Sequence, residues 1–173
     1  MKILIAYYSR RGLNYLGGDV VDLPVGNTEV AAGMIQELTG GETFRIDTAK
    51  AYPAGYEETT EVAKQELRQK ARPALTGHVA NLGDYDAIIL GYPNWWGTMP
   101  MAVYSFLEEY DFSGKTILPL CTHEGSGLGH SPSDIKKLCP GANVSRGLAI
   151  QGGSVQGAQS EISEWLKATG MIE

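Results

Sequence analysis

The fold is decided by the stretch AIILGYPNWWGTMP, which occupies residues 87–100. Its first four residues are all apolar, as expected of a strand that is buried on both faces of a sheet. Glycine, proline and asparagine then end the run, and helical periodicity begins near Met99. This succession of strand, loop and helix is typical of one unit of an α/β protein with a parallel sheet.

The same succession is repeated along the whole chain, with no internal repeat. The β-type runs lie at 3–8, 43–47, 87–92, 116–122 and 146–151. The helical stretches lie at 28–39, 56–72, 99–110, 133–138 and 155–168. Since parallel strands need crossover connections, we predict an α/β fold with a doubly wound, five-stranded parallel sheet between two layers of helices. Pro119 lacks an N–H, so we expect a local bulge there; Thr98 is the expected N-cap of the third helix, with Pro100 in its first turn.

Composition indicates one globular α/β domain over residues 1–173, with 43% apolar and 20% charged residues. The net charge of −6 disfavours nucleic acid and anionic membranes as partners and favours a partner with a basic patch. Residues 87–107 carry no charge, but their prolines and glycine would break a membrane-spanning helix. Two cysteines and no signal-like start predict a reducing, cytoplasmic location.

The loop after the first run has the composition of an anion site. The first run ends in Tyr-Tyr-Ser-Arg, residues 7–10, and the next helix opens with Gly-Asn-Thr-Glu, residues 26–29. Hydroxyls and free N–H groups at a helix start can hold a phosphate without a lysine. An insertion at about 11–26 separates the two halves, and its Gly17-Gly18 step predicts a hairpin. A plain helix cap is the other interpretation of Asn27-Thr28.

The loop after the third run contains two adjacent tryptophans, Trp95 and Trp96, between proline and glycine. Neighbouring residues on an extended segment point in opposite directions. We therefore expect one indole to enter the core and the other to offer its face to a planar ring at the sheet edge. The alternative is that both pack beneath neighbouring loops.

The loop after the fourth run reads CTHEGSGLGH, residues 121–130. Its glycines let the backbone approach a ligand closely, and Thr122, His123 and Ser126 add polar edges suited to a heteroaromatic ring. The loop lacks the dinucleotide fingerprint, the spacing of a zinc site and a nucleophile elbow. Cys121, at the end of a strand, is expected to be a small buried hydrophobe.

Taken in order, these three loops resemble those of the flavodoxin-like family. The resemblance implies a sheet in the order 2-1-3-4-5, with FMN at its carboxyl edge, and it implies no catalytic proton-transfer residue and no metal. It assigns the FMN phosphate to Ser9, Arg10, Asn27 and Thr28. It places along the flavin ring Tyr92, Pro93, Asn94, Trp95, Trp96 and Gly97. It places at the edge of the ring Thr122, His123, Glu124, Gly125, Ser126 and Gly127.

Two roles share this cofactor site. We favour an electron carrier that exchanges electrons with redox partner proteins, because the chain is small and acidic. The alternative is an NAD(P)H-dependent FMN oxidoreductase that acts on quinones or similar small-molecule acceptors. A flavin-free receiver on the same fold is a third interpretation. A receiver needs an acidic cluster near the first strand, whereas that strand ends in tyrosines and a serine.

Overall fold

A parallel sheet forms the centre of the protein, which a computed structural model describes over all of residues 1–173. Its order is β4-β1-β5-β6, and β7 and β8 both pair with the outer side of β6. The predicted order 2-1-3-4-5 is therefore confirmed, with β7 and β8 sharing the fifth position. The strands are β1 (Ile3–Tyr7), β4 (Glu42–Arg45), β5 (Ala87–Pro93), β6 (Thr116–His123), β7 (Asn143–Val144) and β8 (Leu148–Gln151).

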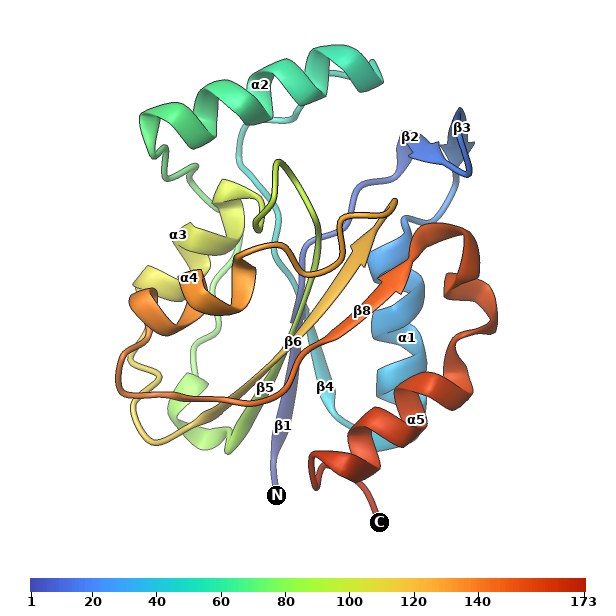
Figure 1. Cartoon of the computed structure of the whole chain (residues 1–173). Helices are drawn as coiled ribbons and strands as arrows, with labels where there is room; N and C mark the ends of the chain where they lie inside the picture. The colour runs from blue at the N-terminus through green and yellow to red at the C-terminus, as the bar shows by residue number, and fades with distance from the viewer.

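Helices cover both faces of this sheet (Figure 1). One face carries α1 and α5, and the other carries α3 and α4, with α2 beyond α3. The helices are α1 (Asn27–Thr39), α2 (Tyr56–Gln69), α3 (Met101–Glu109), α4 (Ser131–Leu138) and α5 (Gln159–Ala168), with short 3-10 turns at Leu82–Asp84 and Gly152–Gly157. The second turn replaces the expected first part of the last helix, because its glycines disfavour an α-helix. None of the helices combines the length and apolar character needed to cross a bilayer.

The inner strands are buried on both faces, as their continuous apolar sequence predicts. In β1 and β5, alternate side chains enter opposite cores. Leu4 and Ile88 pack in the core beneath α3 and α4, whereas Ile5 and Ile89 pack in the core beneath α1 and α5. This two-sided burial fixes the strand register, and it thereby fixes which loops emerge together at the carboxyl edge.

Pro119 lies in β6 without a bulge, which corrects the expectation from its sequence. β6 pairs with β5 in an unbroken register. On the other side of β6, β7 pairs only with Thr116 and Ile117, and β8 pairs only from Leu120 onward. The Ile117 carbonyl accepts a hydrogen bond from Ser145 on this side, so Pro119, two residues on, also faces the fifth strand. Its missing N–H falls in the break between β7 and β8.

Thr98 is not the N-cap of α3, which is a second correction. The N-cap is Pro100, and α3 begins at Met101. The Thr98 hydroxyl lies 2.6 Å from Asp134 Oδ2 and 2.7 Å from the Tyr104 hydroxyl. Thr98 therefore joins the loop after β5 to α3 and α4, because these partners hold its hydroxyl away from the first N–H groups of the helix.

The insertion in the first loop forms the predicted hairpin. Strands β2 (Gly12–Leu16) and β3 (Asp19–Leu23) pair in antiparallel fashion. Gly17 and Gly18 connect them with φ angles of 62° and 97°, which glycine adopts readily. The hairpin stands outside the main sheet, at its carboxyl end (Figure 1).

Candidate functional site

A cavity of about 570 Å³ lies at the carboxyl edge of the sheet, a size that suits a small molecule or cofactor. It is walled by the loops that follow β1, β5 and β6, together with the hairpin and α2. The Asn27 helix start and the Trp95-Trp96 turn line this same cavity. The three loops singled out in the sequence therefore converge on one space, as the sequence predicted.

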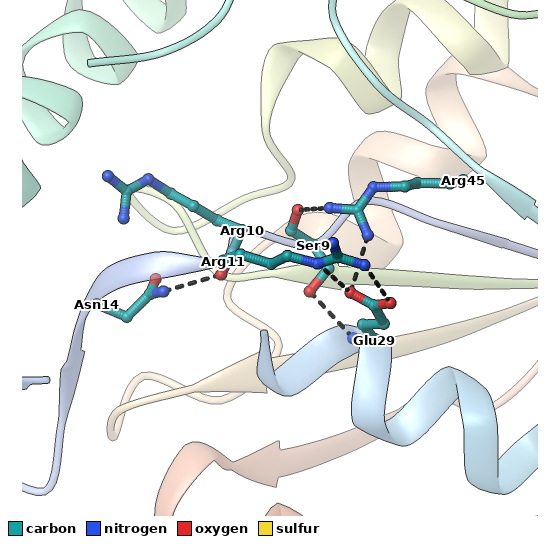
Figure 2. Close-up of polar contacts among 6 residues, drawn as sticks. All are labelled: Ser9, Arg10, Arg11, Asn14, Glu29 and Arg45. Carbon is teal, nitrogen blue, oxygen red and sulfur yellow. Dashed lines mark hydrogen bonds and ion pairs between the residues drawn. The ribbon is translucent and has the colours of Figure 1, made fainter. Parts of the chain in front are cut away.

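One end of the cavity is formed by the start of α1. The N-cap is Gly26, and neither Asn27 nor Thr28 caps the helix through its side chain, so the plain-cap interpretation is wrong. The Ser9 hydroxyl accepts a hydrogen bond of 3.0 Å from the Glu29 N–H, as Figure 2 shows. The N–H groups of Asn27 and Thr28 have no acceptor in the protein, which leaves a partial positive charge facing outward from the helix.

Gly26 is needed for this close approach of α1 to β1. A methyl group at this position would overlap Ser9 Oγ and would lie 2.6 Å from the Arg10 carbonyl oxygen. Any larger residue would therefore push the start of α1 away from the end of β1. The sequence Gly-Asn-Thr thus combines a steric requirement with free N–H groups.

Two buried hydroxyls connect this end of the cavity with the carboxyl end of β6. Thr28 Oγ1 and Thr122 Oγ1 lie 2.8 Å apart, and both residues are less than 5% exposed. A methyl group at Gly91 would lie 3.2 Å from Thr28 Cγ2, so α1 also packs tightly over β5. The three loops are therefore held in fixed positions relative to one another.

The two tryptophans have different surroundings, and the expectation that one of them enters the core is confirmed, whereas stacking of the other on a planar ring stays a prediction. Trp95 packs against the core and makes edge contacts with Tyr8 and Tyr52, with ring centroids 5.3 Å apart in each pair. Trp96 is 49% exposed; its indole N–H donates to the Thr60 carbonyl, and the Lys64 ammonium lies over its ring. Both indoles line the cavity. The alternative in which both are buried beneath loops is wrong.

Backbone strain accompanies this arrangement. Trp96 has a φ of 57°, which residues other than glycine rarely adopt, and Gly97 follows with a φ of 87°. The Asn94 amide supports the turn, because its oxygen accepts from the Gly97 N–H and its nitrogen donates 2.9 Å to the Gly127 carbonyl. Asn94 therefore joins the loop after β5 to the loop after β6. Such strain is characteristic of functional loops.

Arg10 reaches across the cavity toward α2. Its Nη2 lies 3.1 Å from the Pro53 carbonyl, the Ala54 carbonyl and Thr59 Oγ1, and its Nη1 contacts the Leu13 carbonyl. Burial lowers the pKa of this guanidinium. Arg10 thus holds the hairpin to α2, and the expected contact of its side chain with a phosphate stays a prediction.

The structure separates the expected site residues into two groups. Those that line the cavity are Arg10, Asn27, Pro93, Asn94, Trp95, Trp96, Gly97, Thr122, His123, Glu124 and Ser126. Those that do not line it are Ser9, Thr28, Tyr92, Gly125 and Gly127. Ser9 and Thr28 are buried directly behind the helix start. The Tyr92 ring is fully buried in the core, where its hydroxyl is hydrogen-bonded to Ser131.

One wall of the cavity was missed in the sequence. Its residues come from the hairpin and α2: Asn14, Tyr15, Tyr56, Thr59, Thr60 and Ala63. Tyr15 and Tyr56 contact each other with ring centroids 5.9 Å apart. Tyr15, an exposed aromatic residue in the hairpin, could have indicated this wall, whereas the sequence of α2 is that of an ordinary amphipathic helix.

Buried cysteines add no reactive group to the site. Cys121 is fully buried at the end of β6, and burial raises its pKa to about 12. Its thiol therefore stays protonated at neutral pH and packs as a small apolar residue, as predicted.

The fold and the cavity together define the class: flavodoxin-like α/β proteins, whose ligand site lies at the carboxyl edge of a parallel sheet. The family model described as Flavodoxin matches residues 20–169, and the chain belongs to this family. A search of curated protein sequences gives no match.

Solved structures show the same fold. The chain is similar to a candidate flavoprotein from Bacteroides eggerthii DSM 20697, with 28% identity, a TM-score of 0.79 and coverage of 98% of both chains. A second one, from Bacteroides uniformis ATCC 8492, has 28% identity and a TM-score of 0.75, with coverage of 96% of this chain and 97% of that one. A flavoprotein from Lactobacillus acidophilus NCFM, solved in complex with FMN, has 19% identity and a TM-score of 0.68, with coverage of 95% and 97%.

Proposed function

We propose that this protein binds FMN in the cavity at the carboxyl edge and works as an electron carrier. The observation that carries the proposal is the convergence of the loops after β1, β5 and β6 on one cavity that includes a helix start with free N–H groups. Family membership and the FMN complex of the Lactobacillus acidophilus flavoprotein support the choice of cofactor.

The residues at the two ends of the cavity fit the two ends of FMN. Asn27 lines the cavity, and its N–H and side-chain amide, with the free N–H of Thr28 directly behind it, offer neutral donors to a phosphate monoester. At the other end, Trp95 and Trp96 offer aromatic surface to a planar ring. Thr122, near the carboxyl end of β6, adds a polar residue to the lining.

Bound FMN supplies the redox chemistry, in steps of one or two electrons. The protein's part is to bind and orient it. Trp95 is held by Tyr8 and Tyr52 and cannot move away from the ring without breaking both contacts. Trp96 lines the cavity and is half exposed to solvent, so a docked partner could approach a bound flavin beside it.

The charge of the protein supports a carrier. A net charge of −6 favours transient docking to a redox protein with a basic patch, because such attraction accelerates encounter more than it strengthens the complex. An NAD(P)H-dependent oxidoreductase is the competing role. Anaerobic mixing with NADPH and with NADH separates the two, since only the enzyme bleaches the flavin rapidly without a partner reductase.

Reconstitution tests the cofactor assignment. Apoprotein is titrated with FMN, riboflavin and FAD, and flavin fluorescence quenching reports binding. We expect FMN to bind most tightly; protein that FMN cannot reconstitute would refute the proposal.

A matched pair of glycine variants sharpens this test. Gly26→Ala introduces the methyl group that collides with Ser9 and the Arg10 carbonyl, so FMN binding should weaken about tenfold or more. Gly33→Ala lies in the same helix, where a methyl group meets no atom within 4 Å, and it should leave binding unchanged. If the two variants bind FMN equally well, the start of α1 does not take part in phosphate binding.

A further inference from the structure

Arg45, at the end of β4, contacts the loop after β1 and the first turn of α1, which the proposed function assigns to the phosphate. Its Nη2 donates 3.0 Å to the Ser9 carbonyl and its Nη1 donates 2.9 Å to Glu29 Oε1, as Figure 2 shows. Arg45 does not line the cavity, and the guanidinium packs over the Tyr7 ring at 5.9 Å. It therefore bridges the end of β1 to the first turn of α1.

The contact with the Ser9 carbonyl fixes the direction of the next N–H. The protein has no cis peptide bond, so the Ser9 carbonyl and the Arg10 N–H point in opposite directions across one planar peptide unit. With the carbonyl held by Arg45, the Arg10 N–H points away from Arg45. No protein atom accepts it, which gives it the same free status as the N–H groups of Asn27 and Thr28.

The Ser9 side chain is fixed as firmly as its carbonyl. Ser9 is 5% exposed, and its hydroxyl already accepts the Glu29 N–H. Rotation of the Ser9 peptide would turn a carbonyl dipole toward the bound anion and would leave Arg45 with one partner fewer. Loss of Arg45 would permit this rotation, because the Ser9 carbonyl has no other donor in the protein.

Glu29 fixes the orientation of Arg45. Its carboxylate also receives Arg11, at 2.9 Å from Nη2 to Oε2, and hydrogen bonds from Arg11 and Arg45 lower the pKa of Glu29. The guanidinium of Arg45 is thus committed to two oxygens, whereas Arg11 contacts only the carboxylate of Glu29. The two arginines differ in one respect: only Arg45 touches the phosphate-loop backbone.

We propose that Arg45 is a positioning residue for phosphate binding: it holds the Ser9 carbonyl back so that the Arg10 N–H joins those of Asn27 and Thr28 in receiving the phosphate. This rests on the proposed binding of FMN. Arg45 acts through the backbone and does not touch the ligand, so its effect falls on the phosphate and not on the flavin ring.

Comparison of FMN with riboflavin, which lacks the phosphate, isolates this effect. Arg45→Met should weaken FMN binding about tenfold or more and change riboflavin binding less than about twofold. Arg72→Met is the matched control, since Arg72 is similarly exposed, pairs with Glu108 at 2.9 Å and does not line the cavity. It should change neither affinity. Equal loss of both flavins in Arg45→Met, or no loss, would overturn the proposal.

Inorganic phosphate gives a second readout that needs no flavin. In ¹⁵N-labelled apoprotein, added phosphate should shift the amide signals of Arg10, Asn27 and Thr28 together. In Arg45→Met, the Arg10 amide should stop responding while the two helix amides still respond. An unchanged Arg10 response contradicts the proposed role.

Arg45→Lys serves if Arg45→Met does not fold. A lysine ammonium cannot span both oxygens as the guanidinium fork does, so we expect a smaller but still phosphate-selective loss. Retention of the full selectivity for FMN in this variant would overturn the proposal. Wild-type protein that binds neither flavin refutes FMN binding itself, an outcome distinct from any result with Arg45.

Discussion

The hydrogen bond between Thr28 and Thr122 joins the start of α1 to β6, and its contribution to stability can be measured. Thr28→Val keeps the shape of the side chain and removes its hydroxyl, leaving the Thr122 hydroxyl buried, 4% exposed, with no partner. A buried polar group left unpaired costs about 1–3 kcal/mol. We therefore expect Thr28→Val to lower the free energy of unfolding by about 2 kcal/mol, and Thr122→Val to do the same.

The double variant decides whether this reasoning holds. With both hydroxyls replaced by methyl groups, nothing is left unpaired, and such a replacement can be nearly neutral. The double variant should therefore lose about 1 kcal/mol or less, against about 4 kcal/mol for independent sites, a coupling of about 3 kcal/mol. Urea unfolding of the four apoproteins measures it. If the losses in the double variant are additive, the two hydroxyls are not energetically coupled and the reasoning is refuted.

The same two single variants test Thr28 as a phosphate ligand. Both lose the same hydrogen bond, but only Thr28 belongs to the helix start. If the Thr28 hydroxyl also reaches the phosphate, Thr28→Val weakens FMN more than riboflavin, whereas Thr122→Val does not discriminate between them. Equal losses of FMN and riboflavin in Thr28→Val would reject that role.

Other perturbations separate packing, charge and closure. Trp95→Ala should lower the free energy of unfolding by about 3 kcal/mol, because Trp95 packs on the core, and an unchanged stability would contradict this packing. Trp96→Gly should change the free energy of unfolding by less than about 1 kcal/mol, since glycine relieves the strain of the positive φ. Both variants should weaken FMN binding. Hydrogen bonds from Arg11 and Arg45 lower the pKa of Glu29 from 4.5, so its ion pairs stabilise the fold above pH 4.5, and that stability is lost as pH falls through the lowered pKa. Glu29→Gln should therefore lower the free energy of unfolding by about 1 kcal/mol at neutral pH and by progressively less in acid. Urea unfolding at a series of pH values measures this difference. The Glu124 carboxylate accepts the Gly17 N–H at the hairpin tip, so Glu124→Ala should speed FMN release about fivefold in stopped-flow displacement, and an unchanged rate would show that the hairpin does not retain the cofactor.

Local patterns were enough to predict the scaffold and the position of the site. Uninterrupted apolar runs of strand length, bounded by turn residues, identified the inner strands, because a strand covered on both faces has such a sequence. The Gly17-Gly18 step identified the hairpin, since the backbone conformation of its turn favours glycine. The loops after β1, β5 and β6 had to meet, because parallel strands place their carboxyl ends at one edge.

Side-chain partners could not be predicted in this way. Thr98 has the local context of a helix cap, yet it binds Asp134, 36 residues away. Pro119 is acceptable only because the fifth strand is divided beside it. The sequence also did not indicate that the Arg10 guanidinium binds Pro53 and Thr59, more than 40 residues away, and the predicted contact of Arg10 with a phosphate is untested.

The sequence by itself thus determined the succession of strands, helices and turns along the chain, because these depend on spacing within a few residues, whereas the order of the strands in the sheet was predicted from the resemblance to a family. Only the tertiary structure decided which donors remain free at the carboxyl edge of the sheet. Arg45 and Ser9 lie 36 residues apart and meet because β4 pairs with β1 in one register. Such contacts depend on the packing of whole elements, which no short stretch of sequence specifies.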